Sequence, residues 1–160
     1  MKRIISLTLP AVILAMLACV QTILPSEQLQ IQEVIEVNQP QDTLYVRAMD
    51  WLAKTFRSSK KVIQYEDKVA GRIVGKGIMK VTYVKGFGSL DTWFTLTLEI
   101  KDNKTRVTIS DISIASYVIM GERIPESPIT TQKQLDKVNL KAQKLISSLK
   151  NALGKPAEDW

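Results

Sequence analysis

Apolar and polar residues follow a strand-like pattern along four segments of the chain, and in the clearest of them they alternate as in a strand with one buried face. The clearest segment is residues 92–100, where every second residue is apolar: Phe94, Leu96, Leu98 and Ile100. The other three are residues 61–66, 72–84 and 105–115. A further β-rich segment, residues 30–37, precedes them and predicts a first strand.

Two irregularities interrupt these segments. At Ser110-Asp111 the parity of the apolar residues changes, as one inserted bulge residue would cause. We expect Asp111 to be held by backbone N–H groups rather than to face a pocket. Gly75-Lys76-Gly77 predicts a bulge or a close backbone approach within residues 72–84. This run lacks the strand–loop–helix context and the Lys-Ser/Thr ending of a phosphate-binding loop.

Two other segments carry apolar residues at spacings of three and four, the pattern of an amphipathic helix. The first is residues 43–57, with Asp42 or Thr43 as its N-cap. The second begins with the capping-box pattern Thr131-Gln132-Lys133-Gln134 and ends near Gly154. Its expected buried stripe is Leu135, Val138, Ala142, Leu145, Leu149 and Ala152.

The resulting order, β-α-β-β-β-β-α, predicts an α+β fold with an antiparallel sheet and two helices packed on one face. The other face, rich in Thr and charged residues, would meet solvent or a partner. Residues 116–129 contain Gly and two Pro and are expected to form a loop.

The N-terminus has the pattern of an export signal. Lys2 and Arg3 precede an uncharged apolar stretch that is shorter than the roughly 20 residues of a spanning helix. The run Met16-Leu17-Ala18-Cys19 resembles a lipobox, which predicts lipidation of Cys19. Ordinary cleavage after Ala18 and an uncleaved anchor are the alternatives.

This interpretation divides the chain into a signal peptide (1–18), a tether (19–29) and a single domain (30–160). The mature protein would be held at a membrane by its lipid anchor, in the periplasm or at the outer membrane.

Composition removes several classes of chemistry. The 160 residues contain no His and only Cys19 as cysteine. A disulfide within one molecule, His-dependent nucleophilic catalysis and the usual zinc sites are therefore excluded. The adjacent carboxylates Glu66 and Asp67 would point to opposite faces of a strand, and Asp67 suits a turn. We expect no enzyme activity, cofactor or metal.

The net charge of +6 falls by two when Lys2 and Arg3 leave with the signal, and a mild excess of this size is typical of a solvated surface. We expect no nucleic acid partner. The chain is instead expected to bind an envelope protein or a glycan.

Aromatic residues give the candidate binding site. Trp93 has the opposite parity to Phe94, so it should lie on the open face of the sheet, with Phe87 and Tyr83 nearby. The alternative is an edge aromatic that covers a loop. Trp51, by contrast, lies on the helix stripe and is expected in the core.

A second function is a carrier of a small apolar ligand. Its cavity would lie between the sheet and the C-terminal helix, lined by the apolar stripe of that helix: Leu135, Val138, Leu145 and Leu149.

The sequence also resembles a known family. The runs at 44–56, 63–67, 71–77 and 94–102 look, in that order, like the domain of unknown function 4468. The resemblance covers about residues 42–115. It implies a TBP-like fold, a curved antiparallel sheet with helices on one face, and an exported protein or lipoprotein of a gut-dwelling Gram-negative bacterium. The family has no assigned activity, and a TBP-like architecture does not imply DNA binding.

Overall fold

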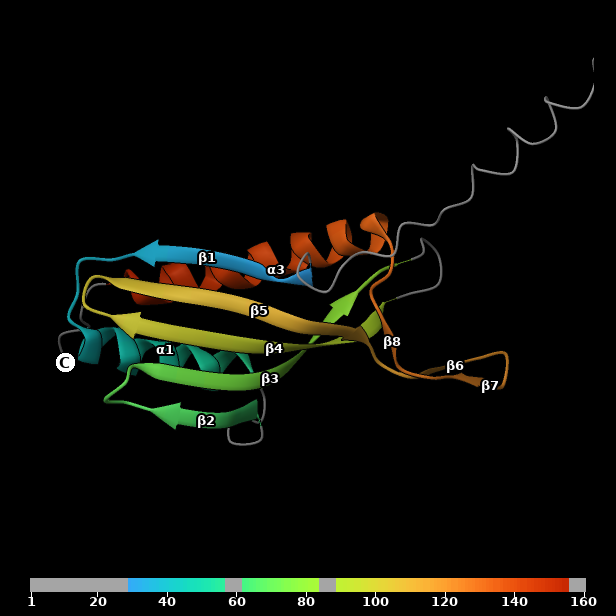
Figure 1. The fold of residues 1–160 in the computed structure, drawn as a ribbon, viewed down its shortest axis with the longest axis horizontal. Helices are drawn as coiled ribbons and strands as arrows, with labels where there is room; N and C mark the ends of the chain where they lie inside the picture. Colours follow the sequence, from blue (N-terminus) through green and yellow to red (C-terminus); the bar gives the residue numbers. More distant parts are fainter. Residues whose placement is uncertain (1–28, 57–61, 84–88, 156–160) are drawn as a thin grey trace, which may run out of the picture.

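The computed structural model describes residues 29–56, 62–83 and 89–155. Its elements follow the predicted order, with three short strands added before the last helix (Figure 1). The helices are α1 (Gln41–Thr55) and α3 (Gln132–Leu153). The strands are β1 (Ile31–Glu36), β2 (Ile63–Asp67), β3 (Arg72–Val81), β4 (Leu90–Lys101), β5 (Lys104–Ile114), β6 (Tyr117–Ile119), β7 (Glu122–Ile124) and β8 (Ser127–Pro128).

The main sheet has the strand order β1-β5-β4-β3-β2, and every neighbouring pair is antiparallel. β8 extends it by pairing with the end of β5. β1 pairs with β5, so the chain crosses from one edge of the sheet to the other through α1. The predicted α+β fold, a curved antiparallel sheet with two helices on one face, is confirmed.

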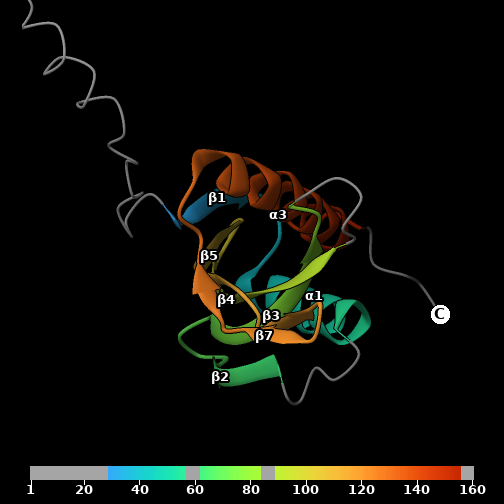
Figure 2. The same cartoon turned by 90° about the vertical axis from the view of Figure 1, so that its right-hand side faces the viewer.

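Both helices lie on the same side of the sheet (Figure 2). α1 packs against α3 and β4, and α3 also contacts β1 and β3. The alternation in β4 directs Phe94, Leu96, Leu98 and Ile100 into this layer, where all four are buried. The core is therefore a single layer between sheet and helices, and the opposite face of the sheet is open.

The capping-box prediction for α3 is confirmed. Thr131 is the N-cap and receives the backbone N–H of Gln134, whose side chain returns to the backbone of Thr131. Gly154 is the C-cap, as expected. The buried stripe differs from the predicted one in two places. Ile146 and Leu153 are fully buried, whereas the predicted Leu145 and Ala152 are only partly buried. The predicted residues follow one another at alternating steps of three and four, an average of about 3.5 residues per turn. A helix has 3.6 residues per turn, so this series moves gradually away from the buried face.

The N-cap prediction for α1 is wrong. The helix begins at Gln41 after Pro40, whose side chain makes no capping hydrogen bond. Asp102, in the β4–β5 turn, accepts the Gln41 backbone N–H at 2.8 Å. The helix dipole also stabilises a negatively charged carboxylate at the helix N-terminus. The start of α1 is therefore fixed by a turn that lies far away in the sequence.

The prediction of a loop over residues 116–129 is also wrong in part. β6 and β7 form a separate two-stranded sheet that projects from the body of the domain (Figure 1). Its turn consists of Met120 and Gly121, both with positive φ, at 50° and 87°. Such turns match the twist of the flanking strands. Residues 72–84 are strand only as far as Val81.

Both irregularities lie where the sequence placed them. β5 carries a bulge, because Thr95 pairs with Ser110 while Trp93 pairs with Ser113. The bulge includes Asp111, with a φ of 49°. Gly75 has the expected close backbone approach, since a Cβ there would lie 3.1 Å from the carbonyl oxygen of Val62. Gly77 is instead approached by a side chain, since a Cβ there would lie 2.4 Å from Cζ of Phe94.

Candidate functional site

Side chains from five strands form the open face of the sheet. One row crosses it through successive cross-strand partners, and its members alternate in charge after an apolar start: Val34, Arg106, Glu99, Arg72 and Asp67. Threonines dominate the middle of the face, where Thr97 pairs with Thr108. The predicted polar face is therefore confirmed.

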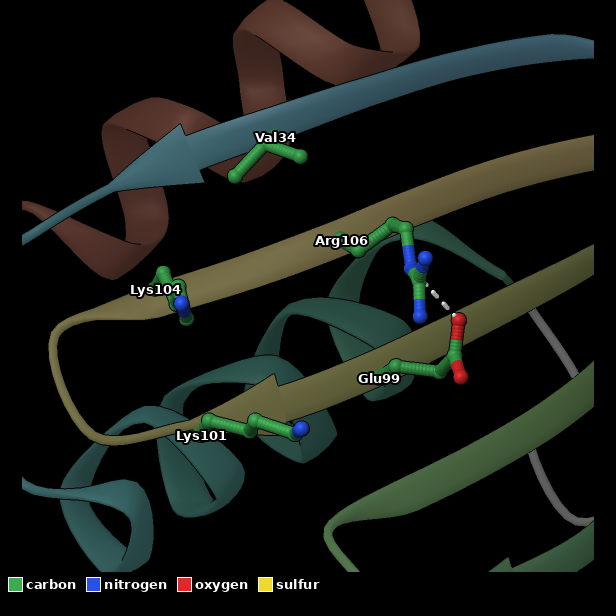
Figure 3. A pocket seen from close by; sticks show the side chains of 5 residues that line it. All are labelled: Val34, Glu99, Lys101, Lys104 and Arg106. Atoms are coloured by element: carbon green, nitrogen blue, oxygen red, sulfur yellow. Dashed lines mark ion pairs between the residues drawn. The ribbon is translucent and has the colours of Figure 1, made fainter.

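A pocket of about 270 Å³ lies at the end of this face that is next to the β4–β5 turn. Figure 3 shows its lining: Val34 on β1, Lys104 and Arg106 on β5, and Glu99 and Lys101 on β4. The pocket thus has an apolar wall, three cationic side chains and one carboxylate.

Arg106 and Glu99 form an ion pair within the pocket. The distance from Nε of Arg106 to Oε2 of Glu99 is 2.8 Å, and both side chains are partly exposed. Exposed pairs of this kind add little to stability, about 0–1 kcal/mol. Besides Nε, the guanidinium carries two terminal nitrogens with further N–H donors.

Lys101 and Lys104 face each other directly across the β4–β5 ladder. Like charges in this position are destabilising. Glu36 lies across from Lys104 on its other side, on β1. Within the described part of the chain, neither lysine has an ion-pair partner at 4.0 Å or less.

Apolar side chains occupy other parts of the open face. Trp93 and Ile78 are cross-strand partners, 38% and 44% exposed. Tyr65, 52% exposed, pairs with Val74 on the neighbouring strands. Trp93 thus lies on the open face, as the parity of β4 predicts. It is roughly 26 Å from Lys101 along β4, at about 3.3 Å per residue.

Trp51 is buried, as expected, and its Nε1 donates to Oγ of Ser148 at 3.1 Å. This bond links the two helices and satisfies the one polar atom of the ring.

Tyr83 does not join Trp93 on the open face. Its hydroxyl is 2.8 Å from Oγ1 of Thr92, which is completely buried on the helix side. Its backbone carbonyl accepts a hydrogen bond from Lys137 of α3. Burial raises the pKa of Tyr83 above its ordinary value. Of the two described aromatic residues of the expected group, Trp93 lies on the open face and Tyr83 does not. Phe87 lies outside the described residues.

The candidate carboxylates have structural roles. Glu66 pairs with Ile73 and Asp67 with Arg72, so the two point to opposite faces, as predicted. Asp67 accepts the backbone N–H of Ala70 at 2.9 Å and shapes the turn. For Asp111, no backbone donor is seen in the described ranges. Its carboxylate receives the Ser110 hydroxyl at 3.4 Å, and the side chain is exposed at the bulge.

The side chains assigned to a carrier cavity belong to the packed core. Val138 and Leu149 are completely buried in it, and Leu145 packs against it. The pocket at Lys101 and Lys104 opens on the opposite face of the sheet, so no observation favours the carrier.

Among residues 29–56, 62–83 and 89–155, no group of three His, Cys, Asp or Glu side chains is placed to hold a metal ion. Over the same ranges, no helix is long and apolar enough to cross a membrane. Cys19 and the predicted signal lie outside them.

Sequence reasoning missed the pocket, although its signal was present. Lys101 and Lys104 flank the β4–β5 turn and are cross-strand partners. In a tight hairpin, the two residues that flank the turn are cross-strand neighbours. Outward parity then adds Glu99 and Arg106 to the same face.

Comparison with known proteins identifies the domain. Residues 32–115 match the domain of unknown function DUF4468 with TBP-like fold. The crystal structure of a DUF4468 family protein from Bacteroides ovatus ATCC 8483 is similar at a TM-score of 0.61 and 14% identity, covering 88% of this chain and 95% of that one. The crystal structure of a TBP-like protein from Parabacteroides distasonis ATCC 8503 is similar at a TM-score of 0.63 and 12% identity, covering 78% of this chain and 91% of that one. No curated protein matches. The chain therefore belongs to the DUF4468 family, a domain of unknown function with a TBP-like fold.

Proposed function

We propose that this protein is a non-catalytic binding module, anchored in the cell envelope, that recognises a partner through the open face of its sheet. The observation that carries the proposal is the placement of large apolar side chains on that face. Trp93, Ile78 and Tyr65 come from three strands and are all more than a third exposed. An exposed aromatic group on a polar face is typical of a recognition surface.

The arrangement of the carboxylates supports a non-catalytic role. Catalysis by carboxylates alone needs two of them at close range on one face. Glu66 and Asp67 are on opposite faces, and Glu99 is held in its ion pair by Arg106. The binding of a protein or glycan partner needs no such pair.

The N-terminal pattern supports the envelope as the setting. A positive start, an apolar stretch and Cys19 at the end of a lipobox-like run favour export and lipid attachment. The tether of residues 19–29 would then present the domain near the membrane surface. Mass spectrometry of protein from its own host tests this step. A mature chain that begins at a lipidated Cys19 is expected, and cytosolic protein with an intact Met1 would contradict it.

Affinity capture from host envelopes tests the binding surface. A partner that wild-type protein recovers should be lost on Trp93→Ala, because this substitution removes the largest exposed apolar group of the open face. Leu140→Ala is the matched control, since Leu140 is 63% exposed on α3, on the other side of the molecule. Equal recovery by the Trp93 and Leu140 variants would count against the open face.

A further inference from the structure

We propose that the pocket formed by Val34, Glu99, Lys101, Lys104 and Arg106 binds a phosphate monoester, either as a free small molecule or as a lipid headgroup. The inference rests on the proposed function, since it names a ligand class for one end of the same open face. It depends on three features of the pocket: its unpaired lysines, its net charge, and its size and walls.

The unpaired lysines are the first feature. Lys101 and Lys104 are exposed and opposed across the ladder without a carboxylate between them. Asp102, which lies between them in sequence, accepts the backbone N–H of Gln41. Glu36, the partner of Lys104 on β1, forms no ion pair with it at 4.0 Å or less among the described residues. An anion between the two ammonium groups would replace a repulsion by two attractions.

The charge of the lining is the second feature. Three cationic side chains and one carboxylate leave a net charge of two positive units around the pocket. A phosphate monoester carries about −1.5 to −2 at pH 7 and offers three acceptor oxygens. Two ammonium groups and the guanidinium of Arg106 supply N–H donors for these oxygens. A single carboxylate would neutralise only half of this charge.

Size and walls are the third feature. A volume of about 270 Å³ lies just below the range of roughly 300–1,000 Å³ that is typical of sites for drug-sized ligands. It suits a phosphate with a small organic group. Val34 offers an apolar surface to that group, since its side chain is 53% exposed. The carboxylate of Glu99 has more acceptor positions than the contact of Oε2 with Nε of Arg106 uses, so it can also accept a hydrogen bond from a ligand hydroxyl.

Isothermal titration calorimetry tests the inference. It uses the full chain, purified from host envelopes in non-ionic detergent. The probes are glycerol 3-phosphate, dihexanoyl phosphatidic acid and acetate. We expect both phosphates to bind at low salt, acetate to bind at least about tenfold more weakly, and added NaCl to weaken all binding. The tighter of the two phosphates identifies the source of the ligand.

Variants locate the site. Lys101→Gln combined with Lys104→Gln should weaken glycerol 3-phosphate binding by at least about tenfold, since two charge-assisted contacts are lost. Lys76→Gln combined with Lys80→Gln makes the same change of charge on the same face, outside the pocket, and should stay within about twofold. Equal losses in both double variants, or no binding of either phosphate, would overturn the inference. Loss of partner capture on Trp93→Ala would still support the proposed function in that case.

Discussion

Phe94 and Gly77 are cross-strand partners in β4 and β3, and the ring of Phe94 occupies the space in which a side chain of residue 77 would begin. A Cβ at Gly77 would lie 2.4 Å from Cζ and less than 3 Å from both Cε atoms of that ring. The ring is almost completely buried and also contacts Phe56 at the end of α1. This pair therefore ties the middle of the sheet to the first helix.

Gly77→Ala should lower the free energy of unfolding by about 1–3 kcal/mol, because the added methyl group overpacks the core. Urea denaturation measures the change. Gly154→Ala is the control, since its Cβ would meet only an ordinary contact at 3.4 Å. In a Phe94→Leu background the cost of Gly77→Ala should shrink. An unchanged cost in that background would show that the ring is not the obstacle.

Thr105 and Thr92 form a second matched pair. Both are completely buried, but Oγ1 of Thr105 has no hydrogen-bond partner in the described structure, whereas Thr92 is bonded to Tyr83. Thr105→Val should raise the free energy of unfolding by about 1 kcal/mol by removing an unsatisfied hydroxyl. Thr92→Val should lower it by about 1 kcal/mol, because it leaves the Tyr83 hydroxyl without its partner. Changes of the same sign in both variants would contradict this difference.

The raised pKa values of two tyrosines predict that the protein loses stability at alkaline pH. Burial raises the pKa of Tyr45 above 10.0, with smaller contributions from Glu66 and Asp67, and burial also raises the pKa of Tyr83. The folded protein therefore keeps these protons at a pH where the unfolded chain releases them. Their contribution is fully present below about pH 10 and is lost as the pH rises above it.

Urea denaturation at several pH values tests this prediction. The combined substitution of Tyr45→Phe and Tyr83→Phe should flatten the fall in unfolding free energy above about pH 10. The comparison isolates the contribution of the two tyrosines from that of all other groups in the chain. A fall as steep as that of the wild type would assign the alkaline loss to other groups.

The opposed lysines of the pocket should cost stability. Lys101→Glu replaces a repulsive pair by an attractive one, so it should raise the free energy of unfolding by about 0.2–1 kcal/mol at low salt. The gain should vanish in about 1 M NaCl, where the screening length is about 3 Å. Lys76→Glu is the control, because Lys76 lies opposite the uncharged Thr95. A gain of equal size in that control would indicate a general charge effect.

The parts of the fold that depend on local periodicity could be predicted from the sequence. The strand pattern of β4, the bulge at Ser110-Asp111 and the capping box at Thr131 each follow from residues within one segment. The start of α1 could not be predicted in this way. Its capping carboxylate, Asp102, is 61 residues from Gln41 in sequence.

The candidate site shows the same division. The parity of β4 placed Trp93 on the open face, but it could not place Tyr83, which lies beyond the end of β3. The pocket requires the register of three strands at once, because Val34, Arg106 and Glu99 are neighbours only across β1, β5 and β4. Pairing of β1 with β5 is a long-range choice that no single segment encodes.

The central claim, that the open face of the sheet is the binding surface, is tested most directly by site-specific photo-crosslinking in host cells. A photoreactive residue at Ile78, next to Trp93, should give a discrete crosslinked product with an envelope component. The same residue at Leu140 on α3, which is also exposed, should give none. Crosslinking from Leu140 but not from Ile78 would contradict the account.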